Sequence, residues 1–189
     1  MAKVWQAERD TQNRVTKLFR DDLGYSYLGD RSGRHDNSNI DESLLGSYLK
    51  SRGYSGAEIS SALHQLRVAA SDTHQSLYGR NKAVYALLRY GVSIKVEAGK
   101  LSETIQLIDW QNPEANDFAI AEEVTLNGGQ ERRPDIVLYV NGIAIGVLEL
   151  KNSRVSIAEA IRQSLSNQKP EFNEWFFSTV QFVFAGNDS

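Results

Sequence analysis

The sequence predicts an α/β fold: a mixed β-sheet flanked by helices, with a mainly helical part at the N-terminus. Two observations predict it. Apolar residues recur at helical spacing through the first half of the chain, up to Gly91. After Gly91 the period shortens to alternation and short apolar runs, which are typical of strands. We therefore expect one domain over residues 1–189, with helices mainly in 1–91 and a functional sheet and helix in 92–189.

The helical part has recognisable start and stop signals. Residues 8–22 predict an amphipathic helix that ends before Gly24, and residues 25–28 predict a short edge strand. After a polar loop over residues 29–40, Asp41 is a candidate N-cap for the next helix, which ends at Gly53. Two further helices follow before Gly91.

The second half of the chain predicts a run of strands. Their expected ranges are 92–96, 101–110, 118–126, 134–140, 143–151 and 179–184. A helix over residues 155–168 separates the last two strands, and such a crossover allows them to pair in parallel, so the sheet is mixed. Ile157, Ile161 and Leu165 form one stripe of that helix.

Composition narrows the class of protein. The chain is 41% apolar and 24% charged, which is ordinary for a soluble globular protein. No run approaches the roughly 20 apolar residues of a membrane span, and the first residues lack the apolar stretch of a signal peptide. The absence of cysteine excludes disulfides and thiolate zinc sites and fits a reducing cytoplasm. The net charge of −3 argues against binding nucleic acid by overall charge alone.

Three ionisable groups in apolar surroundings mark the candidate site. Asp135 follows Arg133-Pro134, and fourteen positions later comes Glu149-Leu150-Lys151. Two carboxylates and a lysine in one place would hold a hard cation and activate water, which is the chemistry of phosphodiester cleavage. A plain hairpin with a solvated face is the alternative, but the apolar run around Glu149 favours a central strand, where charges need a function.

The spacing makes a geometric prediction. Glu149 and Lys151 are two apart, so they share a face of the strand. A two-residue Asn141-Gly142 turn without irregularity would place Asp135 on the opposite face from Glu149. An active site therefore requires a three-residue loop or a β-bulge between Asp135 and Glu149.

The pattern P-D, then E-x-K, resembles the PD-(D/E)xK nuclease superfamily. The resemblance implies a restriction-endonuclease-like core in which Asp135, Glu149 and the backbone carbonyl of Leu150 hold Mg²⁺, with Mn²⁺ as a substitute. It also implies that Lys151 positions or deprotonates the attacking water.

A wider resemblance covers essentially all 189 residues. The segments Tyr78-Gly79-Arg80-Asn81-Lys82 and Tyr85–Val92, the early Leu23-Gly24-Tyr25 and the order of elements resemble the N-terminal region of type I restriction enzyme R subunits. The family implies an endonuclease domain acting on double-stranded DNA, an ATP-driven motor in the same subunit, and methyltransferase and specificity subunits as partners. No G-x-x-x-x-G-K phosphate loop occurs here. The strand predicted over 179–184 lies close to the last residue of the sequence. We therefore expect the chain to be a fragment of a longer protein.

The resemblance, and the clustering of arginines around the motif, add further candidate residues to the site. Gln163, twelve positions after Lys151, matches the glutamine of the family's Q-x-x-x-Y element, whereas Asn167 departs from its tyrosine. Ala160, Gln163 and Asn167 share a helical face expected to look into the site. Glu8 is the candidate for a further metal ligand from the first helix. The candidate DNA contacts are Arg132, Arg133, Arg154 and Arg162.

Other assignments stay open at this point. Glu122 and Glu123 lie on a neighbouring strand, where a surface position is the first expectation and a site-facing one the alternative. For the whole chain, the alternatives to the R-subunit nuclease are a standalone PD-(D/E)xK nuclease of DNA repair or a mobile element, and a catalytically silent domain that docks DNA or a motor.

Overall fold

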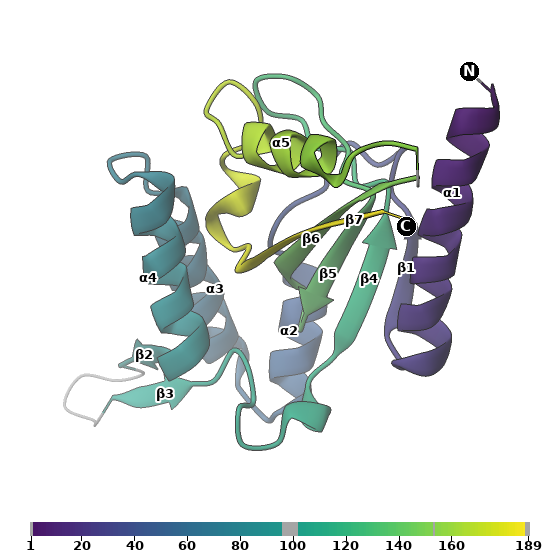
Figure 1. The fold of residues 1–189 in the computed structure, drawn as a ribbon. Coiled ribbons are helices and arrows are strands. Elements are labelled where there is room, and N and C mark those ends of the chain that lie inside the picture. Colours follow the sequence, from purple (N-terminus) through teal and green to yellow (C-terminus); the bar gives the residue numbers. More distant parts are fainter. Residues whose placement is uncertain (1, 96–101, 153, 188–189) are drawn as a thin grey trace.

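A computed structural model describes residues 2–95, 102–152 and 154–187, without the side chains of residues 2–8. Figure 1 shows one mixed five-stranded sheet, flanked by helices, and a separate strand pair beside the helical part. The sheet has the order β1 (Ser26–Asp30), β4 (Phe118–Glu122), β5 (Ile136–Val140), β6 (Ile143–Lys151) and β7 (Phe182–Asn187). The helices are α1 (Ala2–Lys17), which continues as a π-helical turn (Leu18–Asp22), α2 (Glu42–Ser51), α3 (Gly56–Ser71), α4 (Leu77–Tyr90) and α5 (Ile157–Asn167).

The strand directions confirm the predicted mixed sheet. β4, β5 and β6 pair antiparallel in the centre. β7 joins β6 in parallel through the α5 crossover, as the sequence predicts, and β1 joins β4 in parallel at the other edge.

Capping residues fix the helix starts. The side chain of Asp41 caps α2 by accepting the backbone N–H of Leu44. Ser55 and Glu58 form a capping box at the start of α3. α4 ends at Gly91, whose φ of +81° is a backbone conformation that glycine adopts without strain.

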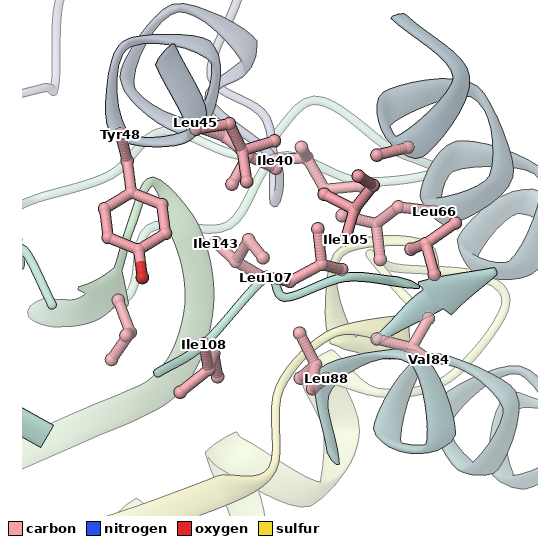
Figure 2. Packing of buried hydrophobic residues seen from close by; sticks show 14 of the residues in the cluster. Ile40, Leu45, Tyr48, Leu66, Val84, Leu88, Ile105, Leu107, Ile108 and Ile143 are labelled. Atoms are coloured by element: carbon pink, nitrogen blue, oxygen red, sulfur yellow. The ribbon is translucent and has the colours of Figure 1, made fainter. Parts of the chain in front are cut away.

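Apolar side chains cover both faces of the sheet. On one face, Ile120, Ile136 and Leu148 pack with Val15 and Phe19 from α1 and its π-helical turn. The residues on the other face include Val137, Tyr139, Val147, Phe176 and Phe177. A third cluster joins α2, α3 and α4 to the turn between β5 and β6. Figure 2 shows its packing and labels residues that include Leu45, Leu66, Leu88 and Ile143. The helical part is thus packed directly onto the sheet.

Four of the predicted strands are wrong in extent. The first two in the second half shorten to β2 (Val92–Ile94) and β3 (Glu103–Ile105), which pair with each other outside the main sheet. Residues 96–101 of these predictions lie outside the described part of the chain. The chain turns away after β3 because Leu107 and Ile108 are buried in the helical cluster and Asp109 accepts the N–H groups of the following turn.

The other two differences have local causes. The strand predicted over 118–126 stops at Glu122, because Glu123 has a left-handed backbone with φ of +50°. The last strand starts at Phe182 rather than Thr179, whose hydroxyl is buried and donates to the carbonyl of Ala144 at 2.7 Å. Among the residues described, no helix is both long and apolar enough to cross a bilayer.

Candidate active site

The β5–β6 hairpin contains the irregularity that the sequence predicts. Its two-residue turn pairs Val140 with Ile143 and Tyr139 with Ala144, but Leu138 then pairs with Gly146. Ile145 is therefore an extra residue on β6, a β-bulge. The prediction of a bulge between Asp135 and Glu149 is confirmed.

The bulge changes which residues face each other. Beyond it, Ile136 pairs with Leu148, and continuing that register places Asp135 opposite Glu149. Partners across an antiparallel pair share a face of the sheet. Asp135, Glu149 and Lys151 therefore lie on one face, the face that also carries Val137 and Val147.

The buried Asn141-Gly142 turn holds this register. Asn141 and Gly142 have φ of +51° and +83°, as a type I′ turn requires. The amide of Asn141 donates to the carbonyl of Leu107 at 2.8 Å, and a Cβ on Gly142 would lie 2.7 Å from the Cβ of Leu44. The turn is thus closely packed against its neighbours, and a shift in the β5–β6 register would break the Asn141–Leu107 hydrogen bond.

Glu149 is completely buried, and α5 supplies donors to both of its carboxylate oxygens. Gln163 Nε2 donates to Oε2 at 2.8 Å, and Asn167 Nδ2 donates to Oε1 at 3.1 Å. The face of α5 expected to look into the site does so. Asn167, at the position of the family's tyrosine, contacts the same carboxylate as Gln163.

The apolar stripe of α5 lies on a different side. Ile157, Ile161 and Leu165 are all exposed, while Ala160, Ser164 and Asn167 are buried against the sheet. α5 therefore turns its amide-bearing face, and not its most apolar one, toward the strands.

Asp135 is tied to three neighbours. Its Oδ2 accepts the backbone N–H of Leu150 at 2.6 Å. Its carbonyl oxygen accepts bonds from Gln12 Nε2 at 3.2 Å and from the backbone N–H of Glu123 at 3.0 Å. The position of Asp135 is consequently set by β6, by α1 and by the end of β4.

Asp135, Lys151 and Gln163 line a cavity of about 500 Å³. Both Asp135 and Lys151 are half-buried. The remaining lining residues are Arg9, Gln12, Asp30, Ser32, Glu123 and Arg133. The fully buried Glu149 does not line the cavity but contacts its lining residue Gln163. The site is therefore a polar cavity with the carboxylates of Asp30, Glu123 and Asp135 at its wall and that of Glu149 buried next to it.

The chemistry of the donor set fits a hard cation. Asp135 and Glu149 offer carboxylate oxygens, the ligands that Mg²⁺ prefers, and Mg²⁺ keeps several waters, so two carboxylates are sufficient. Within the described residues, no group of three or more His, Asp or Glu side chains is suited to hold a metal. A metal ion would share the Glu149 carboxylate with its two amide donors. The carbonyl of Leu150 stays a predicted ligand, and the side chain of Glu8 lies outside the described part of α1.

The end of β4 carries two glutamates with different surroundings, and neither takes the surface position that was first expected. Glu122 is buried and accepts Gln12 Nε2 at 3.0 Å and the hydroxyl of Tyr27 at 2.6 Å. That hydrogen bond raises the pKa of Tyr27 to about 12. Glu123 lines the cavity and pairs with Arg9 at 3.2 Å and Arg133 at 2.7 Å.

Of the four predicted DNA-contacting arginines, the structure places Arg133 at the cavity lining. Arg132 lies over the ring of Phe172, 4.2 Å from its centroid. Arg154 is exposed, and Arg162 lies on the outer side of α5, 4.0 Å from Glu159. None of these three lines the cavity, and their contact with DNA stays a prediction.

Sequence reasoning missed Arg9, Gln12, Asp30 and Ser32 as lining residues. One signal was available, because Gln12 lies one turn after Glu8 and so on the same face of the first helix. Arg9 gave no local signal, since its partner Glu123 is 114 residues away in the sequence.

Comparisons with known proteins find relatives over much of this chain. A family model described as the N terminus of type I restriction enzyme R proteins matches residues 6–189. A putative type I restriction enzyme endonuclease subunit of Methanocaldococcus jannaschii, MjaVIIIP, is 31% identical over 107 residues, which are 53% of this chain and 10% of that protein. The HindI endonuclease subunit of Haemophilus influenzae is 31% identical over 112 residues, 56% of this chain and 11% of that protein. A second M. jannaschii subunit, MjaIXP, is 33% identical over 81 residues, 40% of this chain and 8% of that protein. The matched segments thus span about a tenth of these relatives.

Proposed function

Since the chain belongs to the family of type I restriction enzyme R protein N termini, we propose that it is the DNA-cleaving domain of such a subunit. It hydrolyses phosphodiester bonds of double-stranded DNA with Mg²⁺, or Mn²⁺ in its place. The observation that carries the proposal is the β-bulge at Ile145, which brings Asp135, Glu149 and Lys151 to one face of the sheet.

Each residue has a defined part in this reaction. Asp135 and Glu149 hold the cation, which supplies charge neutralisation and a more acidic bound water. Gln163 and Asn167 keep the Glu149 carboxylate in one orientation. Lys151, at the cavity wall, orients the water that attacks phosphorus while the opposite P–O bond breaks and the leaving oxygen takes up a proton.

The partners follow from the family. In the complete subunit an ATP-driven motor delivers DNA to this domain, and methyltransferase and specificity subunits recognise the target sequence. The relatives are about ten times longer than the matched segment, which leaves room for such a motor. We place the complex in the cytoplasm, where the DNA is.

A plasmid-nicking assay tests the proposal. The complete R subunit carrying this chain is assembled with its partner subunits, and wild type is compared with Asp135→Ala and Lys151→Ala in Mg²⁺ or Mn²⁺. We expect both variants to lose nicking by at least about a hundredfold while ATP hydrolysis persists. Lys169→Ala and Glu171→Ala, at exposed positions outside the cavity, are the matched controls. Normal nicking by either site variant would show that the residues are assigned wrongly.

One observation favours a second candidate, a catalytically silent docking domain. Glu149 is fully buried and both of its oxygens already accept amide hydrogen bonds. A thermal-shift titration of the 189-residue chain separates the two. The nuclease predicts that Mg²⁺ raises the melting temperature of wild type and not of Asp135→Ala, because a ligand that binds the folded state stabilises it. The silent domain predicts no shift in either.

A further inference from the structure

Glu123 occupies an unusual place at the end of β4. Its side chain, 16% exposed, gives one oxygen to each of two arginines: Oε1 to Arg9 Nη1 at 3.2 Å and Oε2 to Arg133 Nε at 2.7 Å. The two arginines come from α1 and from the segment before β5. One carboxylate therefore joins two elements that are far apart in the sequence.

The backbone of Glu123 is also unusual. Its φ of +50° is in the left-handed region, which costs free energy for a residue with a side chain. Its N–H donates to the carbonyl of Asp135 at 3.0 Å, so the conformation is tied to the backbone of the site itself. Backbone strain of this kind persists where the surroundings impose it, and it is concentrated at functional sites.

The two arginines lie where a DNA strand must approach. Arg9 and Arg133 line the same cavity as Asp135 and Lys151, and their side chains are 43% and 49% exposed. A guanidinium group is a planar fork that binds phosphate oxygens through paired hydrogen bonds. These two groups form an arginine rim of a cavity whose lining also carries the carboxylates of Asp30, Glu123 and Asp135.

We propose that Glu123 is a positioning residue that orients Arg9 and Arg133 as a pair of phosphate-binding groups at the cavity mouth. The inference rests on the proposed function for the identity of the ligand, a DNA strand. The pair binds phosphate oxygens of that strand, and Glu123 fixes the separation and direction of the two guanidinium groups.

The direction in which one substitution changes the affinity for DNA tests this role. Glu123→Gln keeps the shape of the side chain and removes a negative charge. If only net charge mattered, binding to DNA would tighten. If Glu123 positions the arginines, binding weakens, and we expect about tenfold in dissociation constant. The measurement is fluorescence anisotropy of a labelled duplex with the 189-residue chain, without divalent metal, over a series of salt concentrations.

The salt dependence gives a readout that a merely structural role would not move. Each lost phosphate contact lowers the slope of log affinity against log salt by about 0.9. We expect Arg133→Ala to lower the slope by about 0.9 and Glu123→Gln to lower it by up to about twice as much, because both arginines lose their orientation. The double variant should add little to Glu123→Gln. Glu114→Gln, which removes a charge at an exposed position outside the cavity, is the matched control and should leave the slope unchanged. Tighter or unchanged binding by Glu123→Gln, or no salt-dependent binding by wild type, overturns the proposal.

The DNA-binding and nicking experiments together distinguish a failure of the positioning role from a failure of the proposed function. Loss of nicking by Asp135→Ala together with unaltered DNA binding by Glu123→Gln leaves the nuclease standing and overturns the positioning role. Weaker binding by Glu123→Gln together with continued nicking by Asp135→Ala supports the positioning role and overturns the nuclease assignment. A melting temperature near that of wild type shows that Glu123→Gln is folded.

Discussion

At the scale of single residues, the most demanding group is the Glu149 carboxylate. It is completely buried in a chain of modest size, and a buried charge without partners is strongly unfavourable. Two amide donors, from Gln163 and Asn167, satisfy its oxygens. The Asn167 side chain therefore stabilises the buried carboxylate of Glu149, at a position where the family pattern has a tyrosine.

A substitution of Asn167 measures that requirement. Asn167→Ala should lower the free energy of unfolding by about 1–3 kcal/mol, because Glu149 Oε1 loses its donor in a buried place. Urea denaturation gives the value. In a Glu149→Gln background, where no charge is left to satisfy, the same substitution should cost less. An equal loss in both backgrounds would mean that Asn167 acts through packing alone.

At the scale of elements, the β-bulge in β6 decides which face of the sheet carries Glu149 and Lys151. Removing Ile145 shifts the rest of β6 by one residue, so Glu149 and Lys151 would point toward α1, among Ile120, Ile136 and Val15. A substitution at position 145 would instead change one side chain and leave the β5–β6 register as it is.

A pair of variants separates the two effects. Deletion of Ile145 should abolish both cooperative unfolding and the Mg²⁺-dependent rise in melting temperature. Ile145→Ala keeps the register and removes only a partly buried side chain, which we expect to cost about 1–2 kcal/mol. Circular dichroism during heating, with and without Mg²⁺, reports on both. A deletion variant with the wild-type response to Mg²⁺ would contradict the role of the bulge.

The helices and strands also show which features of the fold can be predicted from the sequence. The strand predicted over 143–151 is the observed β6, and Asp41 caps α2 as expected, because these features depend on neighbours in the chain. If Asp135 and Glu149 share a site, parity requires a three-residue loop or a bulge, and the structure has the bulge. The stripe of Ile157, Ile161 and Leu165 is misleading if the most apolar face is assumed to be the buried one, because the site demands that amides face Glu149. Local rules fail most often at functional sites, where chemistry overrides packing.

The arginine rim of the cavity could not be predicted for a different reason. Arg9 and Glu123 are joined only by the packing of α1 against the sheet, and nothing in the local pattern of either segment indicates the other. The left-handed backbone of Glu123 is equally hidden, since the sequence after Phe118 reads as an uninterrupted strand. Such contacts depend on the assembled fold.

At the scale of the whole molecule, an ion pair with a buried arginine joins the helical part to the segment between α5 and β7. Arg80 on α4 contacts Glu174 at 2.7 Å, and the two side chains are 7% and 25% exposed. Beside it, Asn81 Nδ2 donates to the carbonyl of Val180 at 2.7 Å. These contacts connect the cluster of helices to the cluster beneath the sheet that contains Phe176 and Phe177.

Breaking the pair tests whether the two parts unfold together. Glu174→Ala leaves the Arg80 charge buried without its partner, and we expect a loss of about 3 kcal/mol. Glu171→Ala, at an exposed position nearby, should change the stability by less than about 0.5 kcal/mol. Chemical denaturation followed by tryptophan fluorescence and circular dichroism measures both. Similar stabilities for the two variants would show that the ion pair does not join the parts.

The crossover from β6 through α5 to β7 also affects the entropy of closing the site. Glu149 is 14 and 18 residues from its donors Gln163 and Asn167, and Asp135 is 15 from Leu150. Gln12 and Arg9, in contrast, meet Glu122 and Glu123 across 110 and 114 residues. For flexible loops, this difference in length corresponds to about 1.8 kcal/mol of additional chain entropy lost on closure. The carboxylate half of the cavity therefore closes through short loops, whereas its α1 side depends on a long-range closure that the surrounding packing must offset.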